Sequence, residues 1–182
     1  MSSTGTSKRT LILLILAFAL PVLAAYSALQ WGWYQGGATN RGELLQQLSY
    51  DQLQLANPDS EHWQIVTQLP AECDQRCQAT ITVIQQAHIA LGREKVRVQP
   101  VIFTTATSDP RAQENLRQLN FTLIPANSEA HQALAPYALV VVDPWGQWVM
   151  GYRADPQQAV PLSMGKDLLA DLRKLLKLSR IG

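Results

Sequence analysis

An uncharged apolar run near the start of the chain is the strongest feature of its hydrophobic pattern. Residues 11–29 contain no charged side chain, and about 20 apolar residues in a helix span the hydrocarbon core of a bilayer. Lys8 and Arg9 precede the run, and aromatic residues typical of a membrane interface gather at its far end: Tyr26, Trp31, Trp33 and Tyr34. We therefore predict a transmembrane anchor over residues 11–30, preceded by a cytoplasmic N-terminus of residues 1–10.

A cleaved signal peptide is the alternative interpretation of this run. Signal-peptide cores hold roughly 7–15 apolar residues, whereas the run here is longer, and no clean small-residue cleavage site precedes a polar mature start. Pro21 is compatible with a membrane helix, in which such a break is tolerated. We expect an uncleaved, single-pass anchor. In a bacterium this places the protein in the inner membrane, with its soluble domain in the periplasm.

The pattern changes twice after the anchor. Residues 31–61 are polar and rich in loop-forming residues, so we predict a stem that docks in part on the following domain. Residues 62–182 are predicted to form that domain, because apolar strands there alternate with amphipathic helices. The predicted elements are a strand 63–66, a helix 77–91, a strand 98–104, a helix beginning at 109–110, an apolar run 121–124, a strand 138–142, its hairpin partner 147–152 and a helix 164–178.

This order of elements indicates an α/β domain. A β-α-β unit supplies parallel strands, and a closing β-β-α unit adds an antiparallel pair and a covering helix. The order is typical of a thioredoxin-like fold, here with an N-terminal transmembrane helix. In that fold a proline, usually cis, precedes the third main strand and faces the thiols. Pro136 stands at the matching place, and we assign it a structural role beside the site.

The only two cysteines lie between the first strand and the first helix of this domain. Cys73 and Cys77 are four residues apart, so at the start of a helix they lie on one face, one turn from each other. The partial positive charge of a helix N-terminus favours the thiolate form. Glu72, Asp74 and Arg76 flank the pair with opposing effects on a thiol pKa. The spacing predicts a thiol site.

Three interpretations of this pair remain open. As a redox pair, one cysteine attacks a disulfide and the other resolves the mixed disulfide. As metal ligands, two soft sulfurs suit Cu(I), and an added histidine suits Cu(II) better. As a structural disulfide, the pair closes a very short loop and constrains the unfolded chain little. The chain has no spacing typical of a zinc site, which needs four ligands.

Composition and motifs exclude other classes of function. The net charge is +1 and only 16% of residues are charged, with no basic cluster. A nucleic-acid partner is therefore not expected. The sequence contains no phosphate-binding loop, no dinucleotide glycine motif and no Ser-His-Asp order, so nothing in it indicates a nucleotide partner or a hydrolase.

Several short segments resemble the Sco/SenC family of membrane-anchored, thioredoxin-like copper proteins. The resemblance extends to small single-span proteobacterial proteins found beside cytochrome c oxidase assembly genes. The matching segments are Cys73-x-x-x-Cys77, Asp143-Pro144-x-Gly146, Gly42-Glu43-Leu44, Ala90-Leu91-Gly92-Arg93-Glu94 and residues 175–182. This resemblance implies a role in maturing the oxidase at the copper centre of subunit II. The implied partners are subunit II or other assembly factors at the inner membrane.

The resemblance also implies copper as a cofactor and suggests a third ligand. Sco proteins carry a ligand histidine near the start of the third main strand, where residues 135–137 are Ala-Pro-Tyr here, and a proline after the second cysteine, where this chain has Gln78. The nearest histidine is His131, predicted in the loop leading to Pro136 on the thiol side. We therefore take His131 as the candidate third metal ligand.

The function expected from these observations is oxidase assembly through Cys73 and Cys77. The two cysteines act as catalytic thiols or, with His131, as ligands of Cu(I) or Cu(II). They serve either copper delivery or thiol reduction at the copper centre. The alternatives are a general periplasmic thiol-disulfide oxidoreductase and a non-catalytic assembly scaffold.

Overall fold

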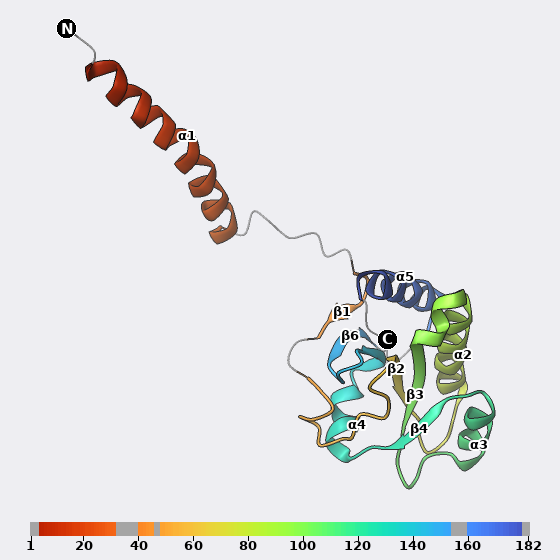
Figure 1. Cartoon of the computed structure of the whole chain (residues 1–182). Coiled ribbons are helices and arrows are strands. Elements are labelled where there is room, and N and C mark those ends of the chain that lie inside the picture. The colour runs from red at the N-terminus through yellow and green to blue at the C-terminus, as the bar shows by residue number, and fades with distance from the viewer. Residues whose placement is uncertain (1–3, 32–39, 46–47, 154–159, 180–182) are drawn as a thin grey trace. The chain divides into compact units, whose positions relative to one another are not determined.

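A computed structural model describes residues 4–31, 40–45, 48–153 and 160–179. The chain divides into two units, one ending at Thr39 and the other beginning at Asn40 (Figure 1). Helix α1 (Thr4–Gln30) belongs to the first unit and contains Pro21. By length and composition, its segment Lys8–Gln30 is apolar and long enough to cross a membrane. The structure thus has a helix where the sequence predicts the anchor.

The second unit is built on a six-stranded sheet in the order β1-β6-β5-β2-β3-β4. Strands β2, β3 and β4 are parallel, whereas β5 pairs antiparallel with β2 and β6, and β1 antiparallel with β6. The strands are β1 (Glu43–Leu44), β2 (Trp63–Gln68), β3 (Val98–Thr104), β4 (Thr122–Pro125), β5 (Tyr137–Val142) and β6 (Trp148–Arg153). This is the sheet of a thioredoxin-like α/β fold, which confirms the predicted fold class.

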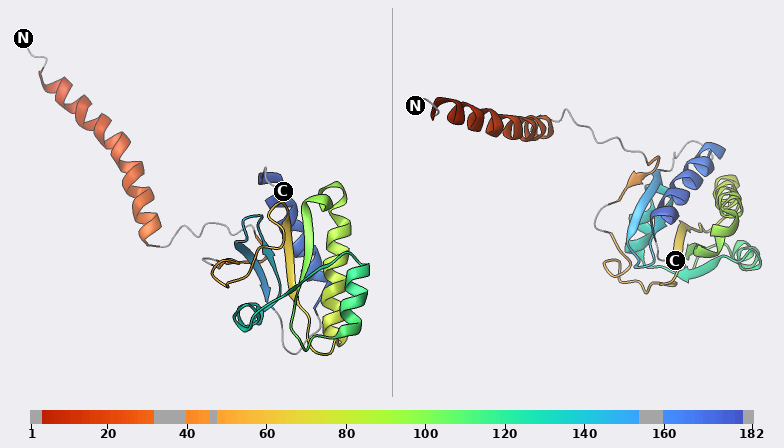
Figure 2. Two further views of the ribbon diagram at one scale, coloured as in Figure 1. Left: turned by 60° about the horizontal axis from the view of Figure 1, so that its bottom comes forward. Right: turned by 45° about the horizontal axis from the view of Figure 1, so that its top comes forward.

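Helices cover both faces of the sheet. They are α2 (Gln75–Ala90), the 3₁₀ helix η1 (Gly92–Arg97), α3 (Pro110–Gln118), α4 (Ser128–Leu134) and α5 (Leu162–Leu178). Helices α2 and α5 lie along one side of the sheet (Figure 2), and α4 packs on the other. Successive strand residues alternate between these two cores, as Ile65 and Val66 of β2 do, because side chains on a strand point to opposite faces.

Residues before β2 contribute to the second core. Tyr50 and Leu53 are only 1% and 2% exposed, and the Tyr50 hydroxyl donates to Gln64 Oε1 at 2.7 Å. The backbone N–H groups of Arg41 and Gly42 donate to the buried carboxylate of Asp171 in α5. The segment predicted as a stem, residues 31–61, therefore supplies core side chains from residue 50. We propose that the folded domain begins near residue 40.

One local expectation differs from the structure. Residues 128–134 form helix α4, where a loop was expected; the Asn127 side chain caps it by accepting from the Ala130 N–H at 2.9 Å. Leu119, just after α3, is 47% exposed. The helix ends at Gln118 and Leu119 forms its C-terminal cap, so the residue leaves the helical face on which Leu116 is buried.

Candidate functional site

The cysteine segment connects the end of β2 to the start of α2. Asp74 caps α2, and its carboxylate accepts from the Cys77 N–H at 2.9 Å. Capping by a short acidic side chain satisfies a helix N–H that has no partner within the helix. Cys77 therefore lies in the first turn of α2, as predicted, while Cys73 precedes the cap. The sequence folds here as a capped helix start rather than as a continuous helix through both cysteines.

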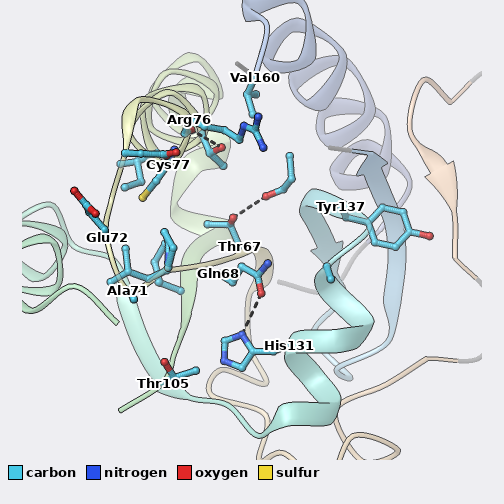
Figure 3. Close-up of a pocket in the computed structure, with 18 residues that line it drawn as sticks. Thr67, Gln68, Ala71, Glu72, Arg76, Cys77, Thr105, His131, Tyr137 and Val160 are labelled. Atoms are coloured by element: carbon cyan, nitrogen blue, oxygen red, sulfur yellow. Dashed lines mark hydrogen bonds between the residues drawn. The ribbon is translucent and has the colours of Figure 1, made fainter. Parts of the chain in front are cut away.

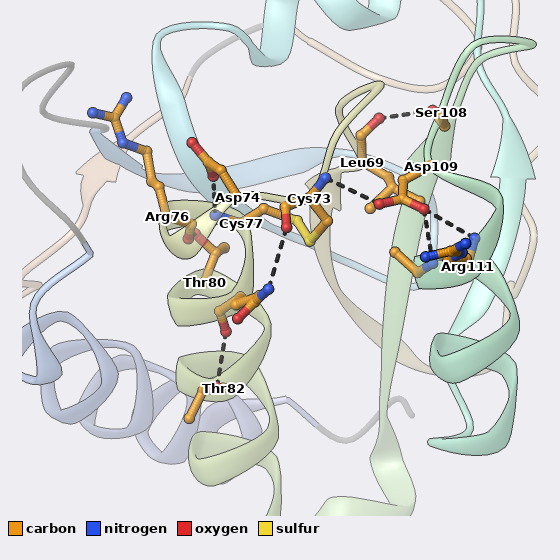
Figure 4. Close-up of a disulfide and its surroundings, with 12 residues drawn as sticks. Leu69, Cys73, Asp74, Arg76, Cys77, Thr80, Thr82, Ser108, Asp109 and Arg111 are labelled. Carbon is orange, nitrogen blue, oxygen red and sulfur yellow. Dashed lines mark hydrogen bonds between the residues drawn. A yellow bond between two sulfur atoms is a disulfide. The ribbon is translucent and has the colours of Figure 1, made fainter.

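A second loop, between β3 and α3, fastens the cysteine segment in place. The Ser108 hydroxyl donates to the Leu69 carbonyl at 2.7 Å, and the Asp109 N–H donates to the Pro70 carbonyl at 3.0 Å. The Asp109 carboxylate accepts the Cys73 N–H at 3.2 Å (Figure 4). The same carboxylate caps α3. The position of Cys73 is thus set by contacts from another part of the chain.

Cys73 and Cys77 form a disulfide with a Cα–Cα distance of 5.2 Å. Both are partly buried and pack against the core that holds α2. In this oxidised state neither sulfur is a thiolate, so the pair stands as the oxidised form of a dithiol or as a fixed crosslink. Of the three interpretations of the cysteine pair, metal ligation requires that the disulfide first be reduced.

An open cleft lies on the Cys77 side of the disulfide. We call it the large cleft; its volume is about 490 Å³. Its walls come from the end of β2, the cysteine segment, the first turns of α2, helix α4 and the start of β5 (Figure 3). The lining residues relevant below are Glu72, Asp74, Arg76, Cys77, His131 and Tyr137. A cavity of this size suits a small ligand or part of an extended peptide.

A smaller hollow lies on the Cys73 side. Its volume is about 370 Å³, and it separates the start of α2 from α3. We call it the small hollow; Cys73, Gln78, Asp109 and Arg111 are among the residues that line it. The two cysteines thus line different cavities.

Asp109 is the charged group whose titration the fold changes at this site. Backbone N–H groups of Ala112, Cys73 and Arg111 donate to its carboxylate and hold its pKa below the ordinary value. Hydrogen bonds to the ionised form favour that form. Asp109 therefore stays negative beside Cys73 at neutral pH. The sequence predicts a helix beginning at residues 109–110 but not the contact of Asp109 with Cys73, because that contact spans 36 positions of the chain.

His131 lies in α4 and lines the large cleft with Cys77. Its Nδ1 is 3.1 Å from Gln68 Oε1, and its ring meets Phe103 edge-on. Within the part of the chain that the structure describes, its buried Nε2 has no hydrogen-bond partner. The same part of the chain contains no group of three His, Cys, Asp or Glu side chains arranged to hold a metal ion. His131 is thus near the predicted site without forming a three-ligand cluster with the cysteines.

The conformation and position of Pro136 differ from the prediction for a thioredoxin-like fold, in which a proline, usually cis, faces the thiols. None of the peptide bonds among the described residues is cis, and Pro136 is exposed. Its neighbours Ala135 and Tyr137 line the large cleft instead. Helix α4 ends at Leu134, so the short turn to β5 carries the proline outward. Tyr137, held against the Arg153 guanidinium, was not singled out by the sequence.

A β-α-β unit, a β-β-α unit and a disulfide at the start of α2 together define a thioredoxin-like protein. The family described as "Transmembrane-like, thioredoxin-like, C-terminal domain" matches residues 63–179. The chain belongs to this family. None of the curated proteins compared with the chain matches it.

Solved structures similar to the chain include Sco proteins. The apo Sco1 protein of Thermus thermophilus is 15% identical, with a TM-score of 0.49, covering 76% of this chain and 99% of its own. A SCO1/SenC family lipoprotein of Bacillus anthracis is 12% identical, with a TM-score of 0.46 and coverage of 78% and 98%. Arabidopsis thaliana ScoI with copper bound is also 12% identical, with a TM-score of 0.46 and coverage of 63% and 85%.

Proposed function

We propose that this protein is a membrane-anchored thiol–disulfide exchange protein whose catalytic residues are Cys73 and Cys77. The observation that carries the proposal is the position of the disulfide. It lies at the N-terminal turn of α2 and borders an open cleft. A helix N-terminus stabilises a thiolate, and access to a thiolate is what exchange requires. A crosslink needed only for stability has no need of a cleft beside it.

The exchange is a two-step transfer of two electrons and two protons. A thiolate of the reduced protein attacks one sulfur of a partner disulfide; that S–S bond breaks, a mixed disulfide forms and the partner's other sulfur leaves as a thiolate, which takes up a proton. The second cysteine then attacks the mixed disulfide, so that the Cys73–Cys77 bond forms and the partner leaves as a dithiol. The protein is oxidised and the partner is reduced. A dithiol reductant must then reduce Cys73–Cys77 for the next turnover.

The proposed partner is a protein whose copper-binding cysteines must be reduced before the metal enters. The sequence resemblance to Sco/SenC proteins supports cytochrome c oxidase subunit II, or another assembly factor of that oxidase, as this partner. A bacterial inner-membrane location agrees with the apolar helix α1. In this arrangement the basic N-terminus stays in the cytoplasm and the domain works in the periplasm.

Copper binding by the reduced chain is a second candidate, favoured by the chemistry of the two sulfurs. Two thiolates four residues apart suit Cu(I), which accepts low coordination by soft ligands. Cys73 and Cys77 would hold the ion, and His131, which lines the same cleft as Cys77, is the histidine to test with them. A Cu(I) competition titration of the reduced full-length chain checks this, with Cys73→Ser, Cys77→Ser and His131→Ala beside it.

The experiment that tests the exchange function uses the full-length chain in detergent micelles. Its substrate is a peptide with one intramolecular disulfide, supplied with dithiothreitol as the dithiol reductant. We expect the wild type to accelerate reduction of the peptide, and each of Cys73→Ser and Cys77→Ser to abolish the acceleration. The control is Gln75→Ser, which puts a serine on an exposed position of the same helical turn and is expected to keep full activity.

Each alternative has its own result. Tight binding of one Cu(I) without peptide reduction supports the copper candidate and contradicts the exchange proposal. A chain that does neither, yet supports oxidase assembly in cells when both cysteines are replaced by serine, is a scaffold rather than an exchange protein.

A further inference from the structure

Three segments of the domain meet at the end opposite the disulfide. Helix α2 begins at the cysteine segment and runs for 16 residues, a length of about 24 Å, so its last turn and η1 lie at the far end (Figure 2). The last turn of α5 lies beside them, because Arg97 of η1 donates to the carbonyls of Leu176 and Ser179 at 3.0 Å. Arg173 of α5 also donates to the Ala90 carbonyl of α2 at 2.8 Å. We call this region the distal end.

Large apolar side chains at the distal end are exposed. Ile89 of α2 is 66% exposed, Val96 of η1 70% and Leu178 of α5 74%. Single exposed apolar residues are ordinary on a protein surface. Here three of them come from three segments that are hydrogen-bonded to one another, so the distal end presents a partly apolar surface without a partner in the fold.

Basic side chains accompany these apolar ones. Arg93 and Lys95 of η1 and Lys177 of α5 are exposed, and none of the three forms a salt bridge with a residue that the structure describes. Glu94, the acidic residue of η1, is paired with Arg97 at 2.9 Å. A cation in the last turn of a helix complements the helix dipole, which accounts for Lys177 but not for exposed apolar residues beside it. We call the three apolar and three basic residues the distal patch.

We propose that the distal patch binds the surface of an anionic lipid bilayer, namely the membrane that α1 crosses. The inference rests on the membrane anchor proposed above and goes beyond the exchange function. Basic side chains are attracted to anionic headgroups. Apolar side chains between them are buried at the boundary of headgroups and acyl chains. The distal patch combines both kinds of residue, and the anchor supplies the bilayer.

The anchor keeps the distal patch within reach of the bilayer. Helix α1 ends at Gln30, and Arg41 is fixed to the domain by its N–H, which donates to Asp171 of α5. The chain between Gln30 and Arg41 spans at most about 40 Å when fully extended. Asp171 and Leu178 are about 10 Å apart along α5. A tether this short gives the bilayer a high effective concentration at the domain, so that even a weak contact is populated.

Trp145 lies at the same end of the sheet. Val142, the last residue of β5, pairs with Gln64 at the start of β2, so the turn that follows β5 carries Trp145 to the distal end. Its side chain is 67% exposed, and tryptophan is enriched at membrane–water interfaces. The exposed Glu61 also precedes β2 at this end, so the positive charge is confined to the distal patch.

Docking through the distal patch sets the direction in which the disulfide faces. The cysteine segment lies at the start of α2 and the distal patch at its end, so the disulfide stands about 24 Å or more from the lipid contact. It faces away from the bilayer. The water-exposed domain of a membrane-bound partner can then reach it, whereas a disulfide buried against the lipid could not be reached.

The test measures which lysines the bilayer shields in the full-length chain reconstituted into nanodiscs. One set of discs contains equal parts of phosphatidylcholine and phosphatidylglycerol, and the other contains phosphatidylcholine alone. Acetic anhydride acetylates exposed lysines, and mass spectrometry gives the rate at each one. We expect Lys95 and Lys177 to react about threefold more slowly in the anionic discs, and the difference to fade at high salt. Lys166, exposed in the first half of α5, is the internal control and is expected to react equally in both.

A charge variant tests the electrostatic part of the contact. Arg93→Glu is expected to remove the shielding of Lys177, because each basic residue near an anionic surface strengthens binding about fivefold. The matched control is Lys166→Glu, which changes the net charge of the chain equally and is expected to keep the shielding.

A second variant tests the apolar part. Ile89→Ser combined with Val96→Ser keeps every charge of the distal patch and is expected to lose most of the shielding of Lys95 and Lys177. Both side chains are exposed, so the thermal unfolding temperature and the rate of peptide reduction are expected to stay as in the wild type. Unchanged shielding in this variant would show that apolar contact with lipid plays no part.

The remaining outcomes separate this proposal from those above. Equal acetylation of Lys95 and Lys177 in both kinds of disc, by a chain that stays in the discs, overturns lipid docking and leaves the anchor and the exchange function intact. Equal slowing of Lys166 overturns it too, since the distal patch is then not the contact. Shielding that appears only when a partner protein is added makes the distal patch a protein interface instead. A chain that does not stay in the discs has no anchor, and both proposals about the membrane fail.

Discussion

Asp109 illustrates how one side chain joins the cysteine segment to the rest of the fold. One of its oxygens accepts the N–H groups of Arg111 and Ala112 and so begins α3. The other accepts the N–H of Cys73. These bonds favour the ionised carboxylate and lower its pKa. A group whose pKa is lower in the folded state stabilises the fold above its unfolded pKa, and this contribution is lost as the pH falls through the folded pKa.

Replacing Asp109 by Asn separates the two roles. Asparagine caps a helix about as well as aspartate, but its amide nitrogen cannot accept the N–H of Cys73. We expect Asp109→Asn to be less stable than the wild type at pH 7, and the difference to shrink as the pH falls below the ordinary aspartate pKa of 3.8. Urea unfolding of both chains between pH 7 and pH 3 measures it. A difference that stays constant over this range would show that the charge of Asp109 contributes nothing.

At the scale of elements, the buried carboxylate of Asp171 connects three parts of the sheet and its cover. Asp171 belongs to α5 and is 2% exposed. It accepts the N–H groups of Arg41 and Gly42, just before β1, and the Tyr152 hydroxyl from β6 at 2.9 Å. Burial first, and Asp171 second, raise the pKa of Tyr152 above its ordinary value. The tyrosine therefore remains a neutral donor to the carboxylate.

Truncating Asp171 is expected to release the edge strand β1. Asp171→Ala leaves three donors without their acceptor, and each buried unsatisfied group costs about 1–3 kcal/mol. We expect the free energy of unfolding to fall by about 2 kcal/mol or more, with faster amide exchange at Gly42. The control is Asp167→Ala, which removes a partly exposed ion pair with Arg41 and is expected to change stability by no more than about 1 kcal/mol. Equal effects of the two substitutions would refute this account of Asp171.

The elements that the sequence predicted are those with long, periodic patterns. Strands β3 and β5 consist mostly of apolar residues, β2 contains the shorter segment Trp63-Gln64-Ile65-Val66, and α2 and α5 carry repeated buried positions. Helix α4 escaped prediction because seven residues offer only two buried positions, Ala130 and Leu134, too few to establish a period. Strand β1 has two residues and depends on pairing with β6. Short elements such as α4 and β1 form because of contacts with residues that are far away in the sequence.

The candidate site shows the same division between local and distant information. The spacing of Cys73 and Cys77 and the helix start are local, and the sequence revealed both. The contact of Asp109 with Cys73 and the shared cleft of Cys77 and His131 arise because segments that are far apart in the sequence meet at one end of the sheet. The spacing of residues along the chain does not predict these contacts. That Cys77 and Cys73 line different cavities is therefore visible only in the fold.

At the scale of the whole molecule, the extent of the folded domain follows from which residues complete its cores. Tyr50 and Leu53 fill the core under α4, and residues 41–42 bind Asp171. A fragment of residues 40–182 keeps these contacts, whereas a fragment of residues 62–182 loses them. Burial of the two side chains alone is worth about 3–6 kcal/mol, a large part of the stability of an ordinary domain.

We therefore expect fragment 40–182 to unfold cooperatively and fragment 62–182 to be largely unfolded at 25 °C. Circular dichroism and thermal unfolding of both fragments measure this. If 62–182 proves as stable as 40–182, residues 40–61 are a stem after all, and the boundary at residue 40 is wrong.

The most direct test of the central claim is the reduction potential of the Cys73–Cys77 disulfide. The full-length chain in detergent is equilibrated with thiol–disulfide buffers of known potential, alkylated, and weighed by mass spectrometry to give the oxidised fraction. If the pair performs exchange, the two-electron transition falls in the range of exchange proteins, between about −270 and −120 mV. A transition below about −300 mV, where structural disulfides lie, would contradict the claim that Cys73 and Cys77 are a catalytic pair.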